Sequence, residues 1–168
     1  MIPKILYHGT CRMRWETGIR QQGLRGDMGR QFEVDEAHMG YVFMTDARAE
    51  AAMFSLMQVT YDEKLYNFRG IRELGGVVIG VHTSNIRDGV EVDPECEIHR
   101  KRQKEMGIDE DMKKSGLNGK WYRYFGTVQR SQIFPYLGVY FNKQSPVLLG
   151  IIERMMAGAT VERKVSLT

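Results

Sequence analysis

The stretch IPKILYHGT, residues 2–10, places an apolar run directly before a histidine, a glycine and a hydroxyl residue. The apolar part predicts a strand over residues 4–8. Gly-Thr often simply closes a strand, so the stretch alone does not distinguish a strand end from a site that presents His8, Gly9 and Thr10 to a ligand. The choice depends on what the rest of the chain places around it.

Length and composition favour one compact domain. A chain of 168 residues can bury roughly 70% of its unfolded surface, enough for a real core. We expect a core over about residues 4–142, with a C-terminal helix and tail over about 145–168. The apolar fraction of 42% and charged fraction of 27% are ordinary, and a net charge of +3 permits a nucleic-acid partner without requiring one.

Cysteine and histidine usage argues against metals and disulfides. Cys11 and Cys96 are too few for a disulfide scaffold or a cysteine-based zinc site. Metal-ligand spacing is also missing from the histidines, which are His8, His38, His82 and His99. The amino terminus resembles neither a signal peptide nor a membrane span, so we expect a cytoplasmic protein that makes no membrane contact. We also expect a monomer.

The first third of the chain alternates strands and helices. Residues 13–22 predict a helix that stops at Gly23, and the polar residues 27–39 predict a loop. GYVFMT, residues 40–45, predicts a second strand. A helix over about 47–60 follows, with Asp46 as its cap, and its inward candidates are Ala51, Phe54 and Leu56.

The remaining elements are a strand over 75–86, strands over 121–128 and 138–141, and a helix over 145–157. Ser145 is expected to cap that helix, with Pro146 at its first position. The charged section 92–120, which includes RKRQK at 100–104, is either a solvated insertion or a substrate-facing loop.

Three separated stretches form a pattern that none of them shows alone. LYHGT (6–10) is followed by Ile19, then by Gly-Leu-Arg (23–25), then by VFMTDARAEAAMF (42–54). This order resembles the ADP-ribosyltransferase superfamily, which includes poly(ADP-ribose) polymerases and rifampicin ADP-ribosyltransferases. In those families a strand with His-Gly-Ser/Thr meets a second strand like Gly-Ile-Tyr-Phe-Ala-Asp, whose following helix brings another aromatic residue to nicotinamide. The likeness covers roughly residues 4–60.

The resemblance implies an α+β fold with two small packed sheets, antiparallel or mixed, and an NAD cleft between them. Phe43 and Phe54 fall at the two aromatic positions and would hold the nicotinamide of NAD, the co-substrate. This suits the chemistry, because a cationic ring is held between aromatic faces with about 0.5 to 2 kcal/mol per contact. Tyr41 shares the strand face of Phe43, since side chains alternate along a strand.

The resemblance gives the other binding roles to the first strand and the turn after the first helix. His8 would donate a hydrogen bond to a ribose hydroxyl, Gly9 would let its backbone approach the carboxamide, and Thr10 would add a hydroxyl. Arg25 would contact the adenosine ribose or the diphosphate. Each residue has a plainer role as a core, strand-end or surface residue, and it is their joint order that favours the site.

Many superfamily members carry a glutamate on a late strand, where it supports an oxocarbenium-like transition state. The corresponding stretch here, residues 121–137, contains no carboxylate. Alignment of its end with the polymerase motif puts Tyr124 near the glutamate position. Gln129 and Gln132 follow, and either could orient a substrate without supplying charge.

The rifampicin-modifying enzymes also lack that glutamate and use an aspartate in an earlier Glu-Asp-Asp-Pro stretch. Glu-Val-Asp-Pro at 91–94 resembles it, which makes Asp93 the candidate catalytic carboxylate, although an Asp-Pro pair also forms simple turns. His8, Asp93 and Tyr124 are therefore the candidate catalytic residues.

The resemblance predicts a transferase of the glycosyltransferase class that moves ADP-ribose from NAD to a macromolecular acceptor, either protein or nucleic acid. Two alternatives stay open. One is an inactive module of the same fold that binds NAD or another nucleotide. The other is an RNA 2′-phosphotransferase-like enzyme, although the His-Val-His-Leu-Ser strand and basic amino-terminal lobe of that group are missing here.

Overall fold

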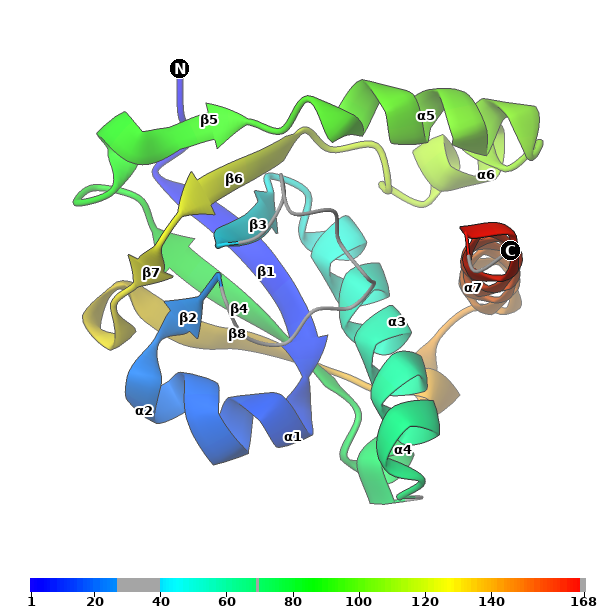
Figure 1. Ribbon diagram of the computed structural model, residues 1–168, viewed down its shortest axis with the longest axis horizontal. Helices are drawn as coiled ribbons and strands as arrows, with labels where there is room; N and C mark the ends of the chain where they lie inside the picture. Colours follow the sequence, from blue (N-terminus) through cyan, green and yellow to red (C-terminus); the bar gives the residue numbers. More distant parts are fainter. Residues whose placement is uncertain (27–39, 69, 167–168) are drawn as a thin grey trace.

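The computed structural model describes residues 1–26, 40–68 and 70–166, with side chains up to residue 157. Its main feature is a six-stranded antiparallel sheet in the order β5-β6-β3-β1-β4-β8, beside a two-stranded sheet of β2 and β7 (Figure 1). The strands are β1 (Ile5–Cys11), β2 (Leu24–Arg25), β3 (Tyr41–Thr45), β4 (Gly76–His82), β5 (Val90–Val92), β6 (Trp121–Phe125), β7 (Thr127–Val128) and β8 (Ile133–Val139).

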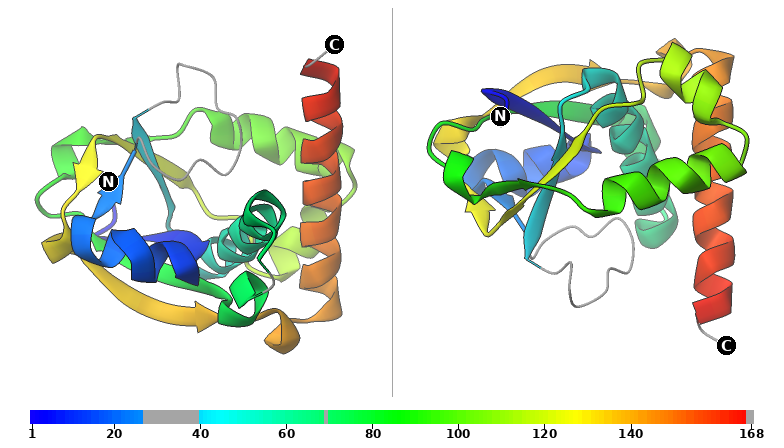
Figure 2. Two further views of the ribbon diagram at one scale, coloured as in Figure 1. Left: turned by 60° about the horizontal axis from the view of Figure 1, so that its bottom comes forward. Right: turned by 90° about the horizontal axis from the view of Figure 1, so that it is seen from above.

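Helices surround the larger sheet. They are α1 (Arg12–Arg14), α2 (Arg20–Gln22), α3 (Arg48–Tyr66), α4 (Gly70–Leu74), α5 (Glu95–Glu105), α6 (Asp109–Lys114) and α7 (Pro146–Ser166). A π-helical turn, Trp15–Ile19, joins α1 to α2 into one helical segment. Figure 2 shows α3 between the sheet and α7, which forms the outer layer.

Strand β1 organises the sheet because it pairs with β3 on one side and β4 on the other. Side chains alternate along it, so Tyr7, Gly9 and Cys11 project to one side and Leu6, His8 and Thr10 to the other. We call the first side the α3 face, because α3 packs on it, and the second the opposite face.

The α3 face allows helix and strand backbones to touch. A Cβ atom on Gly9 would collide with the carbonyl oxygen of Ala51 and lie 2.7 Å from the Ser55 nitrogen. A Cβ atom on Gly76 would in the same way meet the Ser55 side chain. Glycine at these two positions therefore lets α3 lie directly on β1 and β4.

The opposite face carries a separate core. Leu6, Val42 and Ile79 of the large sheet pack there against Trp15 of the helical segment and Val128 of β7. All five side chains are buried. The helical segment and the two-stranded sheet therefore cover this face, and the large sheet is sandwiched between two cores.

Two buried carboxylates attach other elements to α3. Asp62 accepts two hydrogen bonds from Arg14, at 2.6 and 2.7 Å, which fixes the first helical segment. Glu50, with an exposure of 0%, accepts two from Arg100 at 2.9 Å, which fixes α5. A buried carboxylate is expensive unless it is paired in this way, so both pairs constrain the packing.

The α+β class is confirmed, but the sheets differ from the expectation. Instead of two small packed sheets, the described residues form one sheet of six strands and one of two. The strand predicted over 121–128 is divided at Gly126, whose φ of 116° ends β6 and sends β7 into the smaller sheet. The strand predicted over 138–141 is wrong in its bounds, since β8 is paired from Ile133 to Val139.

The cap predictions had opposite outcomes. Ser145 Oγ accepts the Leu148 backbone N–H at 3.1 Å, so the predicted cap of α7 is confirmed. Asp46 does not cap α3; its carboxylate accepts the Lys120 backbone N–H at 2.9 Å. The predicted loop 27–39 lies outside the described residues, and the charged section 92–120 contains α5 and α6.

Replacement of Gly9 tests the close packing of α3. We expect Gly9→Ala to lower the free energy of unfolding by about 3 kcal/mol or more, because the new methyl group overlaps helix backbone that cannot rotate away. Gly18→Ala is the control, since a Cβ atom there has nothing within 4 Å. Urea unfolding monitored by circular dichroism measures both; equal stability of the two variants would contradict the packing argument.

Candidate functional site

His8 is half-buried on β1 and its ring is bonded across to β3. Its Nδ1 lies 2.7 Å from the carbonyl oxygen of Phe43. A carbonyl only accepts, so Nδ1 must carry the proton, and Nε2 of the neutral ring is then an acceptor. Burial lowers the pKa of His8, and the bond to Phe43 partly opposes this. The hydrogen bond from His8 to a ribose hydroxyl stays a prediction.

Thr10 and Tyr124 also lie on the opposite face, where the core covers them. Thr10 is buried, and Tyr124 packs against the core between Val42 and Val90, its partners on the neighbouring strands. Tyr124 thus stands on the same side of the sheet as His8, two strands away. Its predicted catalytic role stays a prediction.

Aromatic side chains of β3 and β6 lie on the α3 face of the sheet, next to the part that α3 covers. The pairing of Tyr7 with Thr45 puts Phe43 and Tyr41 on this face, and the Tyr41 and Phe43 ring centroids are 6.3 Å apart. Phe125, opposite Tyr41 on β6, meets its ring edge-on at 5.3 Å. The shared face that alternation predicts for Tyr41 and Phe43 is confirmed.

A charged pair that no sequence motif indicated completes this surface. Arg123 lies opposite Phe43 and holds its guanidinium carbon 4.5 Å from the Tyr41 ring centroid. Its Nε donates to Glu91 Oε1 at 2.7 Å, from the next strand. We call Tyr41, Phe43, Glu91, Arg123 and Phe125 together the aromatic surface.

Phe54 reaches toward the same region from α3. Its ring contacts Trp121 edge-on at 5.5 Å, and Trp121 lies two residues before Arg123 on the same face of β6. Trp121 is held in turn by a hydrogen bond to Glu50 and by the His99 ring at 4.9 Å. Phe54 and Phe43 therefore stand on one side of the sheet, one from the helix and one from the strand.

Gly9 is also on this face, but the packing of α3 already explains why this position is a glycine. The space above it is filled by the Ala51 carbonyl, so helix packing requires the glycine without any ligand. Contact between its backbone and a carboxamide stays a prediction.

Arg25 and Asp93 lie at two margins of the site. Arg25 is exposed on β2, opposite Thr127. The next residue, Gly26, packs against Gly40, so the end of β2 adjoins the start of β3. Asp93 is only 4% exposed, and its Oδ1 accepts the Glu95 backbone N–H at 3.0 Å where β5 turns into α5. This bond gives Asp93 a turn-forming role, and its catalytic role stays a prediction.

The sheet therefore divides the predicted set. Gly9, Tyr41, Phe43 and Phe54 share the α3 face, whereas His8, Thr10 and Tyr124 project to the opposite face. The α3 face offers ring planes, a guanidinium and a carboxylate. These groups suit a planar cationic ring and an anionic group in one ligand.

Comparisons with known proteins find no relative of this chain: no protein-family model, curated protein or solved structure matches it. Within the described ranges, no helix is both long and apolar enough to cross a membrane. In the same ranges no three His, Cys, Asp or Glu side chains gather where they could hold a metal ion.

The state of His8 gives a pH-dependent stability. Burial lowers its pKa in the folded protein, so below about pH 6.5 the unfolded chain binds a proton that the folded chain does not. The free energy of unfolding should fall as pH falls through this window, by up to about 1.4 kcal/mol per pH unit from this group.

Urea unfolding at pH 7.5 and 5.5 checks this against His8→Asn, whose amide can still donate to the Phe43 carbonyl but does not titrate. Wild type should lose more stability than the variant on acidification. The same loss in both proteins would show that His8 is not the titrating group.

Proposed function

We propose that the protein is an NAD-dependent ADP-ribosyltransferase that moves ADP-ribose to a macromolecular acceptor, protein or nucleic acid. The observation that carries the proposal is the aromatic surface: Phe43 and Tyr41 lie beside Arg123 and Glu91 on one face, with Phe54 approaching from α3. The order of the sequence motifs supports the same function independently.

Binding would use the rings and the guanidinium. Nicotinamide would lie against Phe43 and Phe54, whose faces attract its positive ring. Arg123 would exchange its bond to Glu91 for the diphosphate, since a guanidinium matches phosphate oxygens well. Arg25 would supply a second cation from β2.

His8 is best described as a positioning residue in this proposal. Its Nδ1 bond to the Phe43 carbonyl fixes the strand that carries the nicotinamide-binding ring. Direct contact between its Nε2 and a ribose hydroxyl would require a ligand that reaches both faces of the sheet at the end of β1.

In the reaction the bond between the ribose C1′ and the nicotinamide nitrogen breaks, and its electron pair leaves with nicotinamide, which becomes neutral. The ribose is left as an oxocarbenium ion. An acceptor nucleophile bonds to C1′ and loses its proton to solvent. Glu91, released from Arg123, would stabilise the positive ribose, because it is exposed on the ligand side whereas Asp93 is buried.

A nucleotide-binding module without turnover is the second candidate. The observation that favours it is the Glu91–Arg123 ion pair: with Asp93 buried as well, both candidate carboxylates are engaged by the protein itself. Such a module would bind NAD and release no nicotinamide.

Transfer of adenine-labelled NAD by the purified protein into a cell lysate tests the main proposal. We expect label to become covalently attached, with release of one nicotinamide for each transfer, and protease or nuclease digestion will name the acceptor class. Bound NAD with no label transfer and no nicotinamide would instead establish the binding module.

Two variants test the assigned residues. Glu91→Gln should lower turnover at least tenfold, because it removes the charge that stabilises the transition state. NAD affinity should not fall, since the substitution weakens the ion pair that competes with the diphosphate for Arg123. Phe43→Ala should weaken NAD binding by up to about tenfold, from loss of one ring contact.

Glu73→Gln is the control, since it removes the same charge from an exposed position on α4. Isothermal titration with NAD and a nicotinamide-release assay give the two readouts. Equal turnover in Glu91→Gln and Glu73→Gln would remove Glu91 from the mechanism.

A further inference from the structure

Four rings from β1, β4 and β8 lie in contact at the β8 edge of the large sheet. The Tyr7 ring meets the Tyr136 ring edge-on, with 5.4 Å between centroids. The Phe134 centroid is 6.5 Å from that of Tyr136 and 5.0 Å from that of His82. We call Tyr7, His82, Phe134 and Tyr136 together the ring cluster. None of these residues is assigned to NAD.

The pairing of the strands holds the ring cluster on the α3 face. Tyr7 pairs with Gly80, and Gly80 pairs with Phe134, so these positions share one side of the sheet. A Cβ atom on Gly80 would lie 2.1 Å from the Phe134 ring, which therefore rests directly on the β4 backbone. The register of β4 and β8 shifts beside Tyr136 and leaves that residue unpaired. Such bulges commonly re-aim a side chain at a functional site.

The ring cluster is accessible from outside. Tyr136 is 41% exposed and His82 is exposed, while Tyr7 and Phe134 are half-buried. An exposed group of contacting rings is typical of an interaction site. Although β8 is an edge strand, Pro135 and the irregular register disfavour addition of a further strand along it. A partner would therefore bind the ring faces and not the strand edge.

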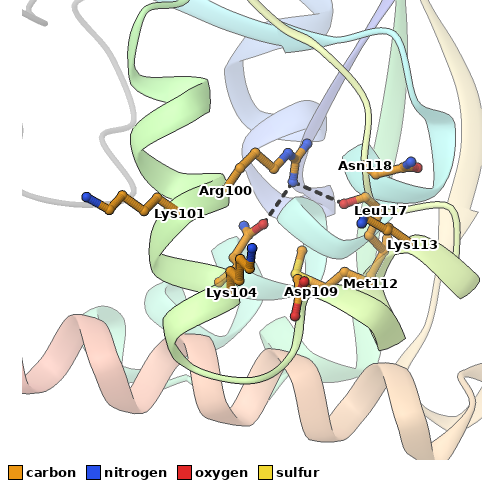
Figure 3. Close-up of a pocket in the computed structure, with 9 residues that line it drawn as sticks. Arg100, Lys101, Lys104, Asp109, Met112, Lys113, Leu117 and Asn118 are labelled. Carbon is orange, nitrogen blue, oxygen red and sulfur yellow. Dashed lines mark hydrogen bonds between the residues drawn. The ribbon is translucent and has the colours of Figure 1, made fainter.

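Arg48, the first residue of α3, adds a cation to the ring cluster. Its Nη1 donates to the Tyr136 hydroxyl at 2.5 Å, and its guanidinium carbon is 5.7 Å from the centroid of that ring. Arg14 and Arg100 each bind a buried carboxylate, and Arg100 also binds the Leu117 carbonyl (Figure 3). Among the described residues no carboxylate pairs with Arg48. Its remaining N–H groups can therefore donate to an anion.

Rings beside an unpaired guanidinium suit a ligand that carries both flat bases and phosphates. Every nucleobase has a face that stacks on aromatic side chains, and a guanidinium binds phosphate oxygens well. A proline-rich peptide also docks on aromatic side chains, but its prolines offer Arg48 no anion. Bases inside a duplex are already stacked on one another, so only a single strand presents their faces.

We propose that the ring cluster binds single-stranded nucleic acid. Bases stack on Tyr136 and Phe134, and Arg48 binds a phosphate of the same strand. Tyr7 supports the Tyr136 ring from the sheet. The inference goes beyond the proposed transferase activity and does not rest on it.

Fluorescence anisotropy of the full chain with labelled oligonucleotides of about 12 nucleotides tests the ligand class. The tighter-binding of oligo-dT and oligo-U should bind at least tenfold more tightly than a dT·dA duplex or an abasic strand of the same length, because both of these lack accessible bases. Equal affinity for the abasic strand would show attraction to phosphate alone and overturn the stacking. Equal affinity for the duplex, or binding of a labelled polyproline peptide in place of the oligonucleotides, would also overturn the proposal.

Matched variants locate the binding surface. Tyr136→Ala should lower oligonucleotide affinity at least fivefold, because one stacking ring is lost. Tyr66→Ala removes the same side chain from an exposed position at the other end of α3 and should bind as the wild type does. Arg48→Gln should lower the affinity and also its dependence on salt concentration. Arg20→Gln is its control, since it removes the same charge from α2 on the opposite face.

Equal losses within either pair of variants would reveal a general effect and overturn the assigned surface. Phe43→Ala separates this inference from the transferase proposal, because it should leave oligonucleotide affinity unchanged. Loss of that affinity in Phe43→Ala but not in Tyr136→Ala would place the strand on the aromatic surface and overturn the inference. Unfolding midpoints of all variants confirm that each is folded.

Discussion

The arrangement of the chain depends on the contact between the backbones of α3 and β1 at Gly9. Any side chain at this position would collide with the Ala51 carbonyl and push the helix off the sheet. The position of α3 in turn sets Glu50 and Asp62, the two buried carboxylates that attach α5 and the first helical segment. One residue without a side chain thus determines how three helical elements meet the sheet.

The same contact gives the His-Gly-Thr motif a structural explanation beside its functional one. Gly9 admits α3, His8 fixes β3 through the Phe43 carbonyl, and Thr10 is buried in the core of the opposite face. A motif can therefore match a catalytic family and be required by packing as well. Phe43 distinguishes the two explanations, because packing alone does not account for its position. It is half-buried, and its ring lies on the α3 face in a surface that includes an ion pair.

The strands and the helix cap that depend on neighbouring residues could be predicted from the sequence. The strands near His8, Phe43 and Val78 and the Ser145 cap all follow from short runs of sequence, and they are present. The aromatic surface was only half predicted, because Arg123 meets Glu91 through the register of two strands that lie more than 25 residues apart. Asp46 had the residue type of a cap, but its carboxylate accepts a hydrogen bond from the backbone N–H of Lys120, which lies in the loop just before β6. Non-local hydrogen bonds of this kind leave no trace in a single sequence.

The basic run at residues 100–104 shows how helical geometry divides one sequence feature among several environments. Successive side chains on a helix are about 100° apart, so adjacent residues cannot share a role. Arg100 turns inward and pairs with Glu50, while Lys101 projects outward. Gln103 is buried beside Arg100, whereas Lys104 is exposed. Burial raises the pKa of Glu50, and the charge of Arg100 opposes this, so one cation of the run is committed to the interior. Net charge counted along the sequence therefore overstates the positive charge that α5 presents at its surface.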